Sequence, residues 1–177
     1  MIQGKSKVEA APSTTLFLFG AHGDLVKRLL MPALYNLRRD GLVDDGLHIV
    51  GVDHNQVSDT DFAAKLKDFI IEQARTKGAE DADKILDPAL LASLEKRISY
   101  ITGDFTDAAT YAAITERIQA NGTANAMFYL ATSPRFFSTV AEQLGEAGLL
   151  KETPEAFRRV VIEKPFGSDL ATAQALN

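Results

Sequence analysis

The sequence predicts an α/β protein with a doubly wound, mostly parallel sheet that carries helices on both faces. Three observations support this prediction. Short apolar runs alternate with segments of helical periodicity from residue 15 to the end of the chain. The apolar runs are continuous rather than alternating, as is typical of strands buried on both faces. Polar and glycine residues follow the carboxyl ends of these runs, where open parallel sheets bind their ligands.

Each expected strand is an apolar run bounded by turn residues. The first contains Leu and Phe and ends at Gly20, and the second ends at Asp53 after a turn rich in Asp and Gly. The third leads to Asp104, the fourth to Ala131 and the fifth to Glu163. In chain order, the expected strands are residues 15–20, 47–53, 98–105, 125–133 and a run within 157–167.

The expected helices are recognised by their ends and by their 3.6-residue periodicity. Pro32 interrupts the first helix, so we expect a kink or a restart there. Ser58 opens the second, and Thr106 or Asp107 caps the fourth. Gly148 closes the fifth. In chain order, the expected helices are residues 24–39, 58–77, 87–97, 106–120, 134–148 and a last one from residue 168.

Length, charge and composition restrict the function. A chain of 177 residues is long enough for one domain with a substantial core. The net charge of −5 argues against nucleic acid or an anionic membrane as the main partner. Without cysteine there are no disulfides, thiolate metal sites or thiol catalysis, which fits a cytoplasmic protein, and we assign no metal ligands. Residues 1–14 lack an apolar signal core and are expected to form a disordered lead-in.

The turn between the first strand and the first helix has the chemistry of a phosphate site. Glycine lets backbone N–H groups approach phosphate oxygens, and a helix N-terminus adds unpaired N–H groups and partial positive charge. The G-x-x-G spacing differs from the common G-x-G-x-x-G pattern, and a simple tight turn also has such glycines. Lys27 and Arg28 would either add charge or form a solvated helix face. The residues predicted to bind a nucleotide here are Gly20, Ala21, His22, Gly23, Asp24, Leu25, Lys27 and Arg28.

Three segments together resemble the glucose-6-phosphate dehydrogenase family: FGAHGDLVKRLLMPALYNL, FYLATSP and VVIEKPFGSDLATAQALN. The resemblance extends over residues 16–177 and implies a Rossmann-like NAD(P)-binding domain at residues 15–177. In that family the domain serves the oxidation of glucose 6-phosphate to 6-phosphogluconolactone in the pentose phosphate pathway.

The resemblance also implies further site residues. Asp104 and Phe105 follow the third strand and would contact the cofactor. Tyr129, with Ala131, Thr132 and Pro134, would form a wall near the nicotinamide, although Tyr129 could equally be a core aromatic. Lys164 would contact both the sugar substrate and the cofactor, unless it is a solvated lysine at a strand end.

One departure from the family concerns the cofactor. Where the family has Ala and an Arg that binds the 2′-phosphate of NADP, this chain has Asp53 and His54. An acid there suits the free ribose 2′-OH of NAD. Facing a 2′-phosphate, it would cost about 4 kcal/mol for unit charges ~4 Å apart at an effective dielectric of 20. We therefore expect NADP or NAD with relaxed or NAD-tolerant specificity. Alternatively Asp53 points away or caps a helix, and a partly protonated His54, or Lys27 or Arg28, binds the phosphate.

A second departure concerns catalysis. The family's general base is a histidine in a second domain, and this chain ends about where that domain would begin. Its three histidines, His22, His48 and His54, lie outside the expected motif. We therefore assign no catalytic residue and expect dinucleotide binding without appreciable turnover. Glucose 6-phosphate is the expected partner of the longer enzyme, and the chain could be a monomer or a homo-oligomer. The alternative is a non-catalytic dinucleotide-binding module or subunit.

Overall fold

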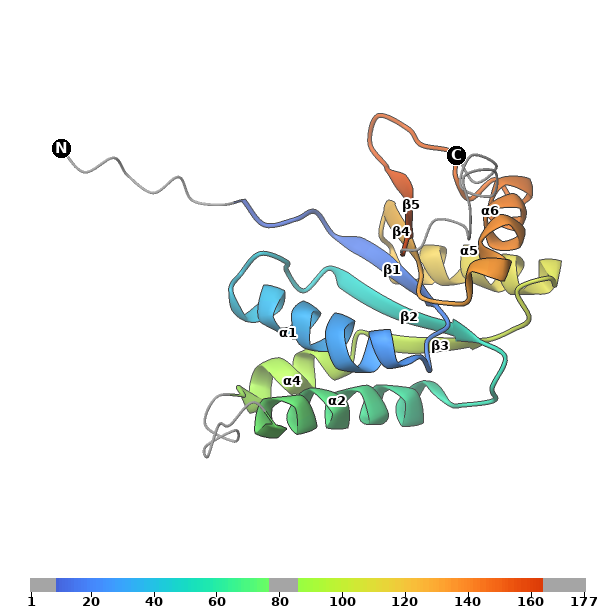
Figure 1. Ribbon diagram of the computed structural model, residues 1–177. Coiled ribbons are helices and arrows are strands. Elements are labelled where there is room, and N and C mark those ends of the chain that lie inside the picture. The colour runs from blue at the N-terminus through green and yellow to red at the C-terminus, as the bar shows by residue number, and fades with distance from the viewer. Residues whose placement is uncertain (1–8, 77–85, 164–177) are drawn as a thin grey trace.

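A single parallel sheet forms the centre of the computed structural model, which describes residues 9–76 and 86–163 (Figure 1). Its five strands have the spatial order β3-β2-β1-β4-β5, and every neighbouring pair is parallel. The first strand thus lies in the middle, and the chain winds outward from it in both directions. This confirms the predicted doubly wound fold. The strands are β1 (Thr14–Phe19), β2 (Leu47–Asp53), β3 (Ile98–Thr102), β4 (Asn125–Leu130) and β5 (Arg158–Ile162).

Helices cover both faces of this sheet. Figure 1 shows α1, α2 and α4 together on one side of the sheet and α5 and α6 on the other. The bounds are η1 (Val26–Leu30), α1 (Met31–Arg39), α2 (Asp59–Thr76), α4 (Pro88–Glu95), α5 (Ala108–Asn121), η2 (Pro134–Phe136) and α6 (Phe137–Glu146). None of the described helices combines the length and the apolar character that a membrane crossing requires. The expected helix from residue 168 lies outside the described residues.

Alternate residues of the central strand enter two separate cores. Leu16 and Leu18 point to the core under α1, α2 and α4. Phe17 and Phe19 point to the core under α5 and α6, where Phe17 stacks on Phe128 with ring centroids 5.4 Å apart. Because successive side chains of a strand face opposite ways, a fully apolar β1 requires helices on both faces. The continuous run in the sequence therefore explains the layered architecture.

Pro32 has the predicted effect on the first helix. The segment before it is wound as a π-helix, in which the Met31 N–H bonds to Val26 O, five residues back. Pro32 then lies in the first turn of α1, where its missing N–H breaks no intrahelical bond. The chain thus restarts its helical winding at the proline instead of ending there.

Several boundaries differ from the expectation. β3 and β4 end at Thr102 and Leu130, earlier than predicted, because the chain then turns into the loops that surround the candidate site. At the N-terminus, Thr14 already belongs to β1, and the Ala11 N–H bonds to Leu42 O at 2.8 Å. The last residues of the expected disordered lead-in are therefore held against the domain, and residues 1–8 lie outside the described part.

The exposed edge of the sheet at β3 is protected by side chains from two helices. The Tyr100 N–H donates to Asp59 Oδ1 at 2.7 Å, and Arg117 Nη2 lies 3.5 Å from Tyr100 O. Arg117 Nη1 also contacts Asp59 Oδ2 at 3.1 Å. This pair takes the place of a neighbouring strand, and satisfying an edge strand's backbone in this way limits pairing with other chains. It also ties the start of α2 to the strand that carries Tyr100.

Replacing Asp59 with Ala should destabilise the domain, because it leaves the Tyr100 N–H without its acceptor and Arg117 without its carboxylate. The expected loss is about 1–3 kcal/mol in the free energy of unfolding, measured by urea denaturation. Asp68→Ala, an exposed acid on the same helix, is the matched control and should change this free energy by less than about 0.5 kcal/mol. Equal effects of the two substitutions would contradict the role given to Asp59.

Candidate functional site

The turn after β1 is shaped by a close contact between two strands. Gly20 has a φ of +81°, and its N–H donates to Val52 O at 3.0 Å. A Cβ atom on Gly20 would lie only 2.7 Å from Ala131 O and 3.0 Å from the Thr132 Cα. The Gly23 N–H closes the turn onto Gly20 O at 2.9 Å. Both the backbone conformation and the space therefore require glycine at residue 20.

The helix that follows presents unpaired amides at this turn. Helical structure begins at Asp24, and the Lys27 N–H, bonded to Gly23 O at 3.3 Å, is the first intrahelical donor of the turn. The N–H groups of Asp24, Leu25 and Val26 precede it and lack an intrahelical acceptor. With the partial positive charge of a helix N-terminus, these groups form a site suited to an anionic ligand.

A cavity of about 450 Å³ opens beside this turn, at the carboxyl ends of β1 to β4. Three larger hollows, of about 710 Å³ at the start of α2, about 580 Å³ beside α4 and about 540 Å³ between α5 and α6, do not touch the glycine turn. We place the candidate site in the 450 Å³ cavity, because among these four cavities of the described residues it is the one where the turn, the strand ends and charged side chains coincide. Its lining residues are Gly20, Gly23, Asp53, His54, Gly103, Asp104, Phe105, Ala131, Thr132, Ser133, Arg135 and Phe136.

Six of the predicted site residues line this cavity, and seven others that the structure describes do not. Lys27 turns toward α2, with Nζ 5.2 Å from the centre of the Phe69 ring, and Arg28 is exposed on the helix surface. Tyr129 packs against the core, and its hydroxyl donates to Glu163, which with burial raises the pKa of Tyr129 to about 12. Three of the others lie in or next to the turn without lining the cavity: Ala21 is buried, Leu25 is half-buried and Asp24 is exposed. His22 lies beside Asp53. Lys164 lies outside the described residues.

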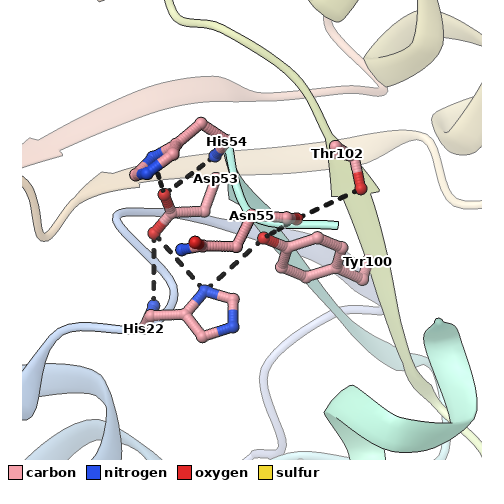
Figure 2. Close-up of polar contacts among 6 residues, drawn as sticks. All are labelled: His22, Asp53, His54, Asn55, Tyr100 and Thr102. Atoms are coloured by element: carbon pink, nitrogen blue, oxygen red, sulfur yellow. Dashed lines mark hydrogen bonds and ion pairs between the residues drawn. The ribbon is translucent and has the colours of Figure 1, made fainter. Parts of the chain in front are cut away.

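The carboxylate of Asp53 lies between two histidines, as Figure 2 shows. Its Oδ1 accepts from the His54 N–H at 2.8 Å and lies 2.8 Å from the ring Nδ1 of His54. Its Oδ2 lies 3.4 Å from the His22 backbone nitrogen and 3.5 Å from the His22 ring Nδ1. Asp53 is only 7% exposed, yet it lines the cavity. It therefore neither points away nor caps a helix, and both of its oxygens have partners.

Tyr100 supports this arrangement from β3. Its hydroxyl donates to Asn55 O at 2.9 Å and lies 3.5 Å from His22 Nδ1 (Figure 2). Burial, and then the nearby Asp53 carboxylate, raise the pKa of Tyr100, so the phenol keeps its proton at physiological pH. The His22 ring packs edge-on against Tyr100 at 5.5 Å. Tyr100 thus anchors the loop after β2 and the histidine that contacts Asp53.

A second carboxylate belongs to the same region. Asp104 Oδ1 accepts from the Thr106 hydroxyl and N–H, both at 2.7 Å. These hydrogen bonds, with a smaller contribution from His54, hold the pKa of Asp104 below its usual range. Asp104 is therefore ionised at neutral pH, and the cavity has acidic groups on its β2 and β3 side.

The sequence interpretation missed a cation on the opposite side. Arg135 lines the cavity from η2, with its guanidinium 4.6 Å from the centre of the Phe136 ring. The sequence signal was available, since Arg135 follows the carboxyl end of β4 by only a few residues. It was overlooked because the segment from residue 134 was interpreted only as a helix. Phe136 was missed for the same reason, and Gly103 and Ser133 were assigned to expected strands without a role in the site. Among residues 9–76 and 86–163, no three His, Asp or Glu side chains gather to hold a metal ion.

A parallel sheet in this order, with a glycine turn where its winding reverses between β1 and β4, defines a dinucleotide-binding domain of the Rossmann class. Comparison with known proteins specifies it further. Residues 17–177 match the family described as "Glucose-6-phosphate dehydrogenase, NAD binding domain". The chain belongs to the glucose-6-phosphate dehydrogenase family.

Individual relatives agree with this assignment. The chain is 34% identical to glucose-6-phosphate 1-dehydrogenase of Leuconostoc mesenteroides over 92% of its own length and 32% of that protein. It is 38% identical to the Treponema pallidum enzyme over 92% of this chain and 31% of that one. The crystal structure of the Mycobacterium avium enzyme is 32% identical with a TM-score of 0.75, covering 93% of this chain and 33% of that one. The chain thus spans about a third of the length of the relatives it matches.

Gly20→Ala should lower the free energy of unfolding by more than the cost of the left-handed backbone conformation alone. A left-handed residue with a Cβ costs about 1–2 kcal/mol, and the overlap with Ala131 O should add about 1–3 kcal/mol of overpacking. Gly41→Ala is the matched control, because Gly41 has a φ of +70° but no atom within 4 Å of its Cβ position. Urea unfolding of both variants measures the difference. If Gly20→Ala lowers the free energy of unfolding no more than Gly41→Ala does, the close approach of Gly20 to Ala131 O does not constrain the turn.

Proposed function

We propose that this chain is the domain that binds NADP or NAD in a glucose-6-phosphate dehydrogenase. The single observation that carries the proposal is the Gly20–Gly23 turn, which presents a helix N-terminus to a cavity at the switch point of a Rossmann sheet. The family match supports the reaction, the oxidation of glucose 6-phosphate to 6-phosphogluconolactone. A solved relative, 29% identical, is described as a complex with its substrate glucose 6-phosphate. We assign the enzyme to the cytoplasm and the pentose phosphate pathway.

In this proposal each strand end has a separate role. The pyrophosphate is bound by the amides of Asp24, Leu25 and Val26, because these N–H groups lack an intrahelical acceptor at the helix N-terminus. The adenosine ribose lies toward Asp53 and His54, at the end of the neighbouring strand β2. The nicotinamide lies on the β4 side, near Thr132, and accepts the hydride when bound. Lys164 contacts the sugar.

None of the histidines is placed to act as the base for the sugar hydroxyl. His22 and His54 contact Asp53 on the ribose side of the cavity. His48 lies beside Arg97, and burial together with that cation lowers the pKa of His48. A general base must lie within hydrogen-bond reach of the proton it removes. We therefore propose that this polypeptide binds the dinucleotide and that proton abstraction depends on residues beyond it.

Calorimetric titration of the chain with NAD and NADP tests the proposal directly. Saturable binding of at least one of them is expected, because the turn offers several convergent amide donors. In parallel, glucose 6-phosphate with either cofactor should give no NADH or NADPH above background. Binding without turnover agrees with the cofactor domain and also with a non-catalytic binding module. Failure of both dinucleotides to bind would contradict the proposal, and turnover at ordinary enzyme rates would contradict the missing base.

Asp53→Asn should shift the cofactor preference toward NADP, because it removes a negative charge from the position facing the adenosine 2′ substituent. The ratio of NADP to NAD affinity should rise at least about tenfold, which corresponds to about 1.4 kcal/mol. Asn keeps the size of the side chain and an oxygen that can accept from the His54 N–H. Asp40→Asn, an exposed acid paired with Arg39, is the charge-matched control and should leave the ratio unchanged. An unchanged ratio in Asp53→Asn would contradict the specificity role.

A further inference from the structure

The two histidines that share the Asp53 carboxylate have very different surroundings. The side chain of His22 is 25% exposed, and that of His54 is 78% exposed. His22 lies among aromatic rings, with Phe62 at 5.9 Å and Tyr100 at 5.5 Å between centroids. His54 lines the cavity beside the glycine turn. The same carboxylate therefore faces one ring in the interior and one at the ligand cavity.

The surroundings of His22 suit only a neutral ring. Its Nε2 is buried and has no hydrogen-bond partner in the described structure. An imidazolium would place an N–H on this nitrogen, and burying such a donor without an acceptor is costly. The neutral ring carries its proton on Nδ1, toward Asp53 Oδ2, while the Tyr100 hydroxyl donates to Asn55 O. His22 therefore positions the carboxylate without neutralising it.

His54 contacts the same carboxylate from the solvent side. Its Nδ1 lies 2.8 Å from Asp53 Oδ1, and its side chain is 78% exposed. The charged groups that line the cavity with His54 are Asp53 from β2, Asp104 from the loop before α5 and Arg135 from η2. His22, from the turn after β1, contacts the same carboxylate, and Tyr100 from β3 contacts His22. His54 itself contributes to holding the pKa of Asp104 low, which indicates electrostatic contact between the two side chains.

We propose that His54 determines the response of this site to the adenosine 2′ substituent, and that NADP binds with uptake of a proton by His54 whereas NAD does not. This inference rests on the proposed dinucleotide site. A 2′-phosphate brings close to two negative charges to a place already occupied by Asp53. An imidazolium at His54 neutralises Asp53 and keeps a ring N–H for a phosphate oxygen. The 2′-OH of NAD donates to the carboxylate and requires no added charge.

Calorimetry in buffers of different ionisation enthalpy measures this proton directly. At about pH 7.5 to 8, a phosphate monoester with a second pKa of about 6 is already dianionic, so uptake reports a protein group. NADP should bind with uptake approaching one proton, and NAD with almost none. Above the titration range of an imidazole, NADP affinity should fall by up to about tenfold for each pH unit, while NAD affinity stays nearly flat.

The His54→Gln variant tests whether His54 is the group that takes up the proton when NADP binds. Glutamine keeps a polar side chain but cannot be protonated, so NADP binding should lose its proton uptake and its steep pH dependence. The ratio of NADP to NAD affinity at about pH 6.5 should also fall about tenfold. His48→Gln is the matched control, because His48 lies at the opposite end of β2 beside Arg97, and both the uptake and the ratio should persist in it.

Three results would overturn the inference. NADP binding without proton uptake would exclude the coupling, and uptake that persists in His54→Gln would assign the proton to another group. Equal uptake with NAD would show that the 2′-phosphate is not the cause. If neither dinucleotide binds at any pH, the proposed dinucleotide site itself fails and this inference with it. If both bind with flat pH profiles, the dinucleotide site stands and only the role of His54 is excluded.

Discussion

The contact between the backbones of Gly20 and Ala131 is the constraint on which the rest of the site depends. It joins the carboxyl ends of β1 and β4, where the winding of the sheet reverses. Because no side chain separates the two strands, the turn closes tightly and the following helix begins next to the cavity. A larger residue would push the turn off β4 and remove the amides of the helix N-terminus from the place where the other strand ends converge.

The second determinant of the site is a carboxylate whose environment is distributed over several strands. Asp53 is the last residue of β2, His22 follows β1, and Tyr100 belongs to β3. Parallel pairing brings the ends of these strands to one edge, so residues far apart in the chain contact one another. The negative charge of Asp53 is therefore held in a fixed position by neighbours on both sides. In the role proposed above, its effect on a ligand depends on the exposed His54, which lines the cavity.

Much of the fold and part of the site could be predicted from the sequence because they depend on local signals. The run from Leu16 to Phe19 indicates a strand buried on both faces, and Gly20 with Gly23 indicates its turn. The side-chain contact of Lys27 and the hydrogen bond between His22 and Asp53 could not be predicted in this way. Lys27 packs on Phe69 of α2, and Asp53 accepts from His22, which follows β1, as well as from its own neighbour His54. The contacts of Lys27 with Phe69 and of Asp53 with His22 depend on how elements pack, which periodicity does not encode.

The sequence by itself determined the alternation of strands and helices, the position of the glycine turn and the family to which the chain belongs. These features follow from residue type and spacing along a short stretch of chain. Only the tertiary structure decided that Arg135 reaches the cavity, that Tyr129 turns to Glu163, and that the Asp53 carboxylate is shared by a partly buried and an exposed histidine. The physical reason is that burial and charge at a sheet edge are set by several strands together, and no single segment contains that information.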